Sequence, residues 1–168
     1  AVLMGALWPG TGRLCRNALA LLQDGAVKDV TFKVDLPNYG VFDERRVFEP
    51  GAAPKVFEVA GVRLGVPVCE DIWSGAVCGA LKAMGAEIIL VPNGSPYRHT
   101  AEQERMTVAH ARVAETGLPL VYVNQVGGQD ELVFDGASFG MEPGNKLVFQ
   151  GKSFEADFIV SDWIRGDN

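Results

Sequence analysis

Short apolar runs separated by turn residues dominate the first third of the chain, which is typical of β-strands. Residues 1–8, 17–22 and 27–34 are rich in Val, Leu, Ala and Phe. Asp24-Gly25 stands between the second and third runs and supplies the positive φ that a two-residue hairpin turn needs. We therefore predict a buried strand over 1–8, followed by a hairpin.

A long loop and a second hairpin come next. Residues 36–54 are rich in Pro, Gly and charged side chains, and a loop of this length inside a compact domain is often functional. The apolar runs 56–60 and 62–68 flank Gly61, which predicts two antiparallel strands. The second of these runs ends directly at Cys69.

The hydrophobic period then changes from that of a strand to that of a helix. Residues 74–84 have helical spacing with Gly85 as a stop, and residues 100–115 form an amphipathic pattern closed by Gly117. The residues of this second helix expected to face inward are Met106, Val108 or Ala109, and Val113. Further strands are predicted over 87–92 and 118–124. From residue 127 onward the pattern predicts hairpins, with strands over 132–134, 137–139, 147–149 and 154–159 and turns at 135–136 and 143–145. This order predicts an α/β layered fold with a mixed sheet.

Composition limits the class of protein. A chain of 168 residues with 48% hydrophobic content buries one core, so we predict one domain over 1–168. The net charge of −6 and the lack of a basic run argue against nucleic acid as a partner. No apolar stretch is long enough to cross a bilayer, and no signal-peptide pattern opens the chain, so we expect no membrane partner.

The three cysteines are odd in number and lack paired zinc spacing. We therefore expect no disulfide framework, no metal and a cytoplasmic location. The two ends read as cut, because the first strand is already under way at residue 1 and residues 162–168 resemble the start of a linker. We expect the chain to be a piece of a longer protein.

Cys69 lies where a nucleophile can be built. The apolar run before it reads as a strand, and the residues after it turn the chain into a helical stretch. A side chain at such a turn is held exposed and rigid, and the next backbone N–H points at the group it attacks. Most cysteines are simply small buried hydrophobic residues. Glu70 and Asp71 beside this one weigh against that reading, because core positions rarely carry acidic neighbours.

Two sets of residues are candidates for proton transfer at this thiol. A Cys–His pair would use His99, which lies in a loop, or His110, which lies within a helix where a structural role is more common. Lys33 follows a strand and precedes the long loop, where its ammonium group can stabilise an oxyanion or relay a proton to a departing amine. The residues alone leave both sets open.

Four segments taken together resemble the nitrilase, or carbon–nitrogen hydrolase, superfamily. They are KVDLPNYGVFDERRVF at 33–48, VCEDIW at 68–73, NGSPY at 93–97 and VNQVGGQDELVFDGASF at 123–139. More narrowly, they are similar to the glutaminase domain of glutamine-dependent NAD+ synthetases. The resemblance implies a nitrilase-type α-β-β-α sandwich with mixed sheets. In this chain we expect a single partial carbon–nitrogen hydrolase domain, lacking its N-terminal part.

The resemblance also implies a chemistry, in which a Glu–Lys–Cys triad cleaves the amide of glutamine. Cys69 matches the nucleophile, Lys33 matches the triad lysine, and Glu44 matches an acidic residue that supports the lysine. Lys33 and the backbone N–H of Glu70 would hold the oxyanion. A thiol beside an ammonium group and a helix N-terminus is expected to have a lowered pKa.

The same resemblance implies a site for the head group of the substrate. Its residues are Tyr39, Glu70, Trp73, Ser95 and Arg98. Glu70 would receive the α-ammonium group, while Tyr39 and Trp73 would form the walls. The family places a basic residue six positions after the serine, but that position is Ala101 here. Arg98 or Arg105 would therefore have to bind the α-carboxylate.

The sequence departs from the family in two further respects. No residue between positions 1 and 12 is acidic, so the glutamate of the triad has no counterpart. The ATP-dependent synthetase domain is also absent. The resemblance implies no cofactor for the glutaminase domain, but ATP, Mg and deamido-NAD+ at the synthetase domain of the same parent protein. We expect glutamine as the substrate, a homo-oligomer as the assembly, and little or no activity unless another segment supplies the glutamate.

Three other readings remain open from the sequence. The chain could be a Cys–His amidase of another fold, a nitrilase relative with a different amide or nitrile as its substrate, or a non-catalytic module in which Cys69 is inert. Substitution of His99 and of Lys33 distinguishes the first of these from the Lys33 mechanism. Labelling of Cys69 by a γ-glutamyl electrophile distinguishes a catalyst from a binding module.

Overall fold

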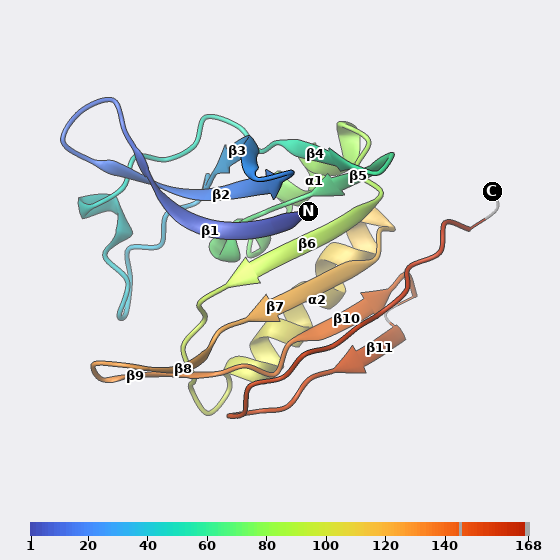
Figure 1. Cartoon of the computed structure of the whole chain (residues 1–168). Coiled ribbons are helices and arrows are strands. Elements are labelled where there is room, and N and C mark those ends of the chain that lie inside the picture. Colours follow the sequence, from blue (N-terminus) through green and yellow to red (C-terminus); the bar gives the residue numbers. More distant parts are fainter. Residues whose placement is uncertain (145, 167–168) are drawn as a thin grey trace.

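Two helices cover one face of a six-stranded sheet, and a three-stranded sheet packs on part of the other face (Figure 1). The helices are α1 (Gly75–Ala83) and α2 (Ala101–Thr116). The computed structural model describes residues 1–144 and 146–166. Its described part therefore forms α, β and β layers with a mixed sheet, which confirms the predicted α/β class.

The three-stranded sheet is antiparallel, in the order β1 (Val2–Pro9), β2 (Cys15–Gln23) and β3 (Ala26–Phe32). Asp24 and Gly25 adopt φ values of 52° and 72° in the tight turn between β2 and β3, as the sequence predicts. The prediction that the first strand is buried is wrong, because Leu7 is 72% exposed. β1 lies at the edge of its sheet, where it has a partner on one side only.

The six-stranded sheet has the order β11-β10-β7-β6-β5-β4. Its strands are β4 (Val56–Val59), β5 (Val62–Gly65), β6 (Ile88–Asn93), β7 (Leu120–Asn124), β10 (Phe139–Glu142) and β11 (Lys146–Gln150). The three central strands β5, β6 and β7 run parallel, and α1 and α2 are the crossovers between them. Parallel pairing requires such crossovers, whereas the β4–β5 and β10–β11 pairs are antiparallel hairpins and β10 runs antiparallel to β7.

Two apolar clusters hold the layers together. The larger cluster lies between the helices and the six-stranded sheet and is centred on Leu81, Val113 and Leu120. The smaller cluster joins the two sheets, with Leu19 of β2 facing Phe57 of β4. Because Val68 and Cys69 pack at this second cluster, the segment that carries the thiol is wedged between the sheets.

The inner face of α2 differs from the prediction. Ala109 and Val113 are buried as expected, but Arg105 and Arg112 are buried beside them, while Met106 and Val108 are only half-buried. Gly117 ends the helix with a φ of 65°. No helix in the described residues has the length and apolar character needed to cross a membrane.

Strand pairing after residue 125 also differs from the prediction. β9 (Leu132–Asp135) pairs with β8 (Val126–Gln129), and β10 joins the main sheet instead of forming a hairpin with β9. Gly136 and Ala137 take φ values of 67° and 51°, which turns the chain from one sheet to the other. The strand predicted over 154–159 is absent from the described structure, although Ser153 forms an isolated bridge with Gly136.

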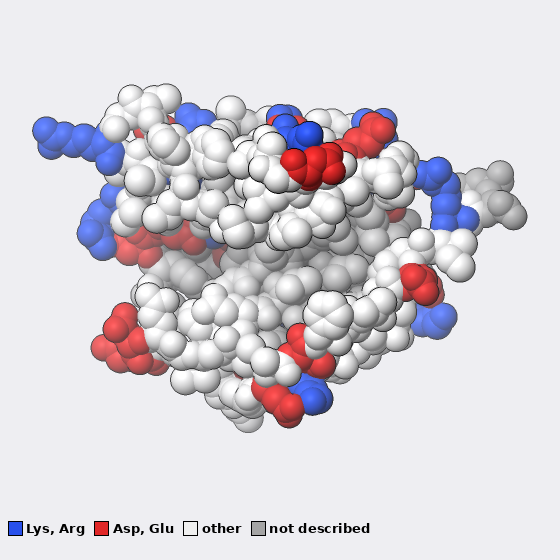
Figure 2. All heavy atoms as spheres, viewed as in Figure 1, with Lys and Arg blue, Asp and Glu red and all other residues white. Residues whose placement is uncertain are grey.

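The six-stranded sheet is only partly covered on the side that faces the three-stranded sheet. Val123 of β7 points to this side and is 53% exposed. A cavity of about 240 Å³ lies beside it, between β7 and the irregular C-terminal segment that includes Ile159. Figure 2 shows that the molecule is hollowed here, with uncharged side chains in the hollow and charged ones at its rim. Within the predicted turn over 143–145, Asn145 lies outside the described residues.

Candidate active site

Three segments gather at the carboxyl ends of the parallel strands. Cys69 follows β5, Ser95 follows β6, and Asn124 is the last residue of β7, where it lies opposite Asn93. In α/β sheets, ligands bind outside this edge, because the loops that leave parallel strands converge there. Residues far apart in the sequence are therefore brought to one place by the topology.

Cys69 begins a 3-10 turn in a strained conformation. The turn, η2 (Cys69–Ile72), follows the extended residue Val68, and Cys69 has a φ of 49°. The left-handed region costs a residue with a Cβ about 1–2 kcal/mol, and such strain concentrates at functional sites. The sheet ladder of β5 ends at Gly65, earlier than predicted. The thiol is thus presented by a sharp turn and not by the last residue of a strand.

Asp71 holds this turn in place. Its Oδ2 atom accepts a hydrogen bond from the backbone N–H of Val68 at 2.9 Å, while its Oδ1 atom accepts from Val34 at 3.0 Å and from Asp35 at 2.7 Å. One buried carboxylate therefore ties the turn of Cys69 to the segment directly after Lys33. Burial nevertheless raises the pKa of Asp71 to about 6, outweighing these three donors.

Lys33 is buried at the end of β3, and its charge is neutralised. Only 1% of its side chain is exposed, and its Nζ atom donates to Oε1 of Glu44 at 2.6 Å. Glu44 comes from η1 (Glu44–Arg46), a single turn within the long loop. A buried ammonium group needs such a partner, because an unpaired charge is expensive to remove from water. The backbone of Lys33 is also fixed, because its N–H donates to the Asn17 carbonyl and its carbonyl accepts from the Gly51 N–H.

Several neighbouring groups shift the pKa of the Cys69 thiol in addition to its burial. Burial raises its pKa, the Lys33 ammonium group lowers it, and the carboxylates of Glu70 and Glu44 raise it, while a backbone hydrogen bond from Gly94 lowers it. The net pKa is raised, so the expectation of a lowered value is wrong. Burial is the dominant cause, since it removes the water that would stabilise a thiolate. A neutral resting thiol needs a base to take its proton when it attacks.

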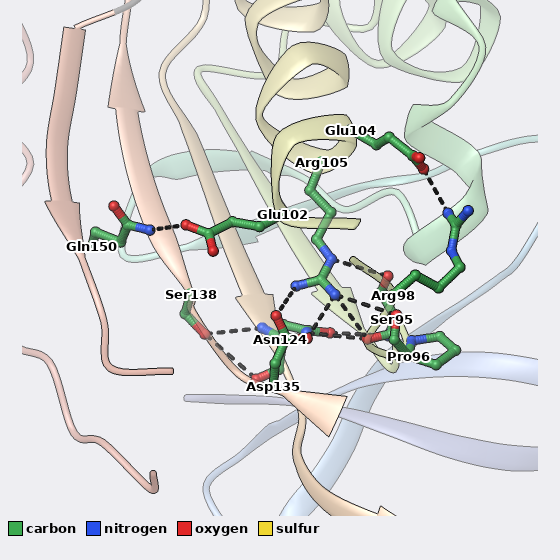
Figure 3. Close-up of polar contacts among 10 residues, drawn as sticks. All are labelled: Ser95, Pro96, Arg98, Glu102, Glu104, Arg105, Asn124, Asp135, Ser138 and Gln150. Carbon is green, nitrogen blue, oxygen red and sulfur yellow. Dashed lines mark hydrogen bonds and ion pairs between the residues drawn. The ribbon is translucent and has the colours of Figure 1, made fainter. Parts of the chain in front are cut away.

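The loop that supplies Gly94 is anchored by its neighbour Ser95. Ser95 N–H donates to Oδ1 of Asn124 at 2.9 Å, and Nδ2 of Asn124 donates to the Ser95 carbonyl at 3.3 Å. Nε of Arg105 donates to the Ser95 hydroxyl at 3.1 Å (Figure 3). The sequence offered a signal for Arg105, because it is four residues from both Ala101 and Ala109 on the buried face of α2.

A second cavity, of about 500 Å³, opens beside Glu70. Three of the predicted head-group residues line it, namely Tyr39, Glu70 and Trp73. The Tyr39 hydroxyl donates to Oε1 of Glu70 at 2.7 Å, and burial, with Glu70 as a further cause, raises the pKa of Tyr39 to about 12. The phenol therefore stays protonated and holds one oxygen of Glu70 in a fixed direction.

The remaining predicted residues lie elsewhere. Ser95 does not line that cavity, and Arg98 is an exposed side chain whose Nη2 atom donates to Glu104 at 2.6 Å. Arg105 is buried and paired with Asp135. His99 is exposed. Among the residues described, no three His, Cys, Asp or Glu side chains are grouped as metal ligands.

Comparison with known proteins shows the family of this chain. The model of the carbon–nitrogen hydrolase family matches residues 1–163. The chain belongs to the carbon–nitrogen hydrolase family. This confirms the resemblance of the four sequence segments, including VCEDIW around Cys69.

Relatives of known activity are longer than this chain. The glutamine-dependent NAD(+) synthetase of Rhodobacter capsulatus is 49% identical over 150 residues, covering 89% of this chain and 27% of that protein. The synthetase of Xylella fastidiosa is 41% identical over 168 residues, covering 95% of this chain and 30% of that protein. The chain thus spans less than a third of the length of these relatives.

Solved structures of the family share the fold. Glutamine-dependent NAD+ synthetase from Acinetobacter baumannii superposes with a TM-score of 0.86 at 40% identity, covering 92% of this chain and 30% of that one. An amidase from Nesterenkonia sp. AN1 superposes with a TM-score of 0.77 at 28% identity, covering 89% of this chain and 58% of that one. A variant of that amidase carries acrylamide added at its active-site cysteine.

Proposed function

We propose that this chain forms the thiol side of a glutamine-hydrolysing site in a glutamine-dependent NAD+ synthetase. The observation that carries the proposal is the buried Lys33–Glu44 pair, which acts on the thiol of Cys69 at a strained turn. The activity of the synthetases that resemble this chain supports the choice of glutamine over other amides.

The proposed reaction has two steps. The Cys69 sulfur attacks the side-chain amide carbon of glutamine, the C–N bond breaks, and the amine leaves as ammonia with the proton of the thiol. Water then cleaves the γ-glutamyl thioester, which gives glutamate and restores the thiol. The Lys33 ammonium group stabilises the tetrahedral oxyanion together with the backbone N–H of Glu70.

The raised pKa of Cys69 makes a general base necessary. Glu44 already shares its Oε1 atom with Lys33, so its proposed role is to hold that lysine. We assign the base to a glutamate supplied by another segment of the parent protein. Without that segment, the chain is expected to release little or no glutamate.

The cavity beside Glu70 is the proposed site of the amino-acid head group. Glu70, oriented by Tyr39, would bind the α-ammonium group, and Trp73 would form a wall. Ser95 and Arg98 do not line this cavity, and they are proposed to contact the head group from the neighbouring loop. Arg98 would exchange its bond to Glu104 for the α-carboxylate of the substrate. The hydrolytic site needs no cofactor in this scheme.

The released ammonia is proposed to serve the synthesis of NAD+ from deamido-NAD+. That step would use ATP and Mg at the synthetase domain of the parent protein, the partner of this domain. We further propose a cytoplasmic homo-oligomer.

The test uses 6-diazo-5-oxo-L-norleucine, a glutamine analogue that alkylates a catalytic thiol with loss of N₂, and mass spectrometry of the Cys69 peptide. It is run with the segment that precedes the matching region in a close synthetase added in trans, and glutamate release from glutamine is measured in parallel. We expect labelling and turnover that Lys33→Met abolishes and His99→Ala preserves. A reversed pattern would establish a Cys–His mechanism, and no labelling with the added segment bound would establish a non-catalytic module.

A further inference from the structure

A buried ion pair lies directly behind the loop that contacts the thiol. Nη1 and Nη2 of Arg105 on α2 donate to the two carboxylate oxygens of Asp135 at the end of β9, at 3.0 and 2.7 Å. The two side chains are only 2% and 3% exposed (Figure 3). A bidentate pair of this kind fixes both direction and distance between the elements that carry it.

The same guanidinium group also holds the loop. Its Nε atom donates to the Ser95 hydroxyl at 3.1 Å, and its Nη2 atom donates to the carbonyls of Ser95 and Pro96, both at 3.4 Å. Figure 3 shows these bonds converging on the loop from one side of the guanidinium, with Asp135 on the other. All three nitrogen atoms of Arg105 are therefore engaged, and Asp135 balances a charge that would otherwise be buried alone.

The anchored loop is connected to the thiol by the peptide unit before Ser95. The backbone N–H of Gly94, which precedes Ser95, lowers the pKa of the Cys69 thiol. We propose that the Arg105–Asp135 pair is a positioning element for Cys69, because it fixes the loop whose Gly94 N–H stabilises the thiolate. Neither residue touches the sulfur in this scheme. Both act through the backbone of residues 94–96.

The inference rests on Cys69 being the nucleophile of the proposed function, but its test needs no turnover. The rate of alkylation of each cysteine by iodoacetamide is followed over a pH range by peptide mass spectrometry. Cys15 is exposed and serves as the internal reference, while Cys78 is fully buried and reports on the integrity of the fold. Cys69 alone is half-buried between them.

Two variants weaken the pair while keeping its volume. Arg105→Lys keeps the charge but loses the planar fork that serves Asp135 and the loop at once, and Asp135→Asn leaves the guanidinium unneutralised. Glu102→Gln is the matched control, because Glu102 is exposed on the same helix and, within the described part of the chain, bonds only to Gln150. Losing one hydrogen bond to an ionised sulfur is expected to move the pH midpoint of Cys69 alkylation up by about one unit.

We therefore expect Arg105→Lys and Asp135→Asn to slow Cys69 alkylation about tenfold below the midpoint, with Cys15 unchanged and Cys78 protected. Glu102→Gln should match the wild type. A faster reaction at every pH with an unchanged midpoint would mean that the loop merely opens, and would overturn the proposal. So would reactivity of Cys78 in both variants, since the pair would then serve the fold as a whole.

Discussion

The buried pair of Lys33 and Glu44 makes a prediction about stability that can be worked out from its surroundings. The atoms Nζ and Oε1 are 2.6 Å apart, and the two side chains are 1% and 16% exposed. Lys33→Met keeps the length of the side chain but removes the charge. Glu44 would then keep its carboxylate in a site with almost no access to water, and breaking a buried pair in this way typically costs about 3–5 kcal/mol.

Removal of both charges is expected to cost much less. In the double variant Lys33→Met, Glu44→Gln, no charge is left unpaired, so we expect a loss of about 1–2 kcal/mol relative to the wild type. Glu44→Gln alone would leave the Lys33 ammonium group unpaired and is also expected to cost about 3–5 kcal/mol. The sum of the two single variants then exceeds the double variant by at least about 4 kcal/mol, which is the expected coupling energy. A matched surface cycle is available in Lys146 and Glu142, which are 75% and 43% exposed at 3.1 Å. That pair is expected to couple by less than about 0.5 kcal/mol.

The assay is urea unfolding of the variants in both cycles, monitored by tryptophan fluorescence. The free energies of unfolding are compared only between variants with equal m-values. Trp73 lies beside the η2 turn and reports on the site directly. The reasoning would be refuted if the Lys33–Glu44 coupling were no larger than that of the surface pair. In that case water would reach the buried ammonium group in solution, and its charge would not be available at full strength to an oxyanion.

Two further predictions concern the same region. Burial raises the pKa of Asp71 from 3.8 to about 6, so between these values the folded state binds more protons than the unfolded state. Stability is then expected to fall by about 2 kcal/mol as the pH rises from about 4 to 6, and by about 3 kcal/mol over the whole titration. Urea unfolding of Asp71→Asn over the same pH range should lack this slope. A Cβ at Gly65 would lie 2.8 Å from Ile89 Cδ1 and 3.0 Å from Ala86 Cβ, so Gly65→Ala is expected to lower the free energy of unfolding by about 1–3 kcal/mol. Gly5→Ala is its control, because nothing lies within 4 Å of that position, and equal effects of the two substitutions would contradict the packing.

Features that depend on neighbouring residues were predictable. The turn at Asp24 and Gly25 and the end of α2 at Gly117 need only a local backbone conformation, and both are where the sequence places them. The strand order was not predictable in the same way. β9 was expected to pair with β10, but the turn at Gly136 sends β10 to the main sheet, and this choice depends on contacts with β7.

In the candidate site, too, some features were predictable from the sequence and others depended on the fold. The resemblance of the four segments placed Lys33, Glu44 and Cys69 in one site, and the folded chain brings their charges within reach of one another. Arg105 and Asp135 are 30 positions apart, and neither belongs to a pattern that would connect them. Only the packing of α2 against the loop after β6 makes them partners.

The amino-acid sequence by itself determined most of the elements, the family and the set of reactive groups, because these follow from short-range patterns and from residue identity. Tertiary structure alone decided how those groups behave. The thiol of Cys69 has an ammonium group nearby, as expected, yet its pKa is raised because burial removes more stabilisation from the thiolate than Lys33 and Gly94 return. Burial depends on every layer packed around a residue, which no local stretch of sequence contains.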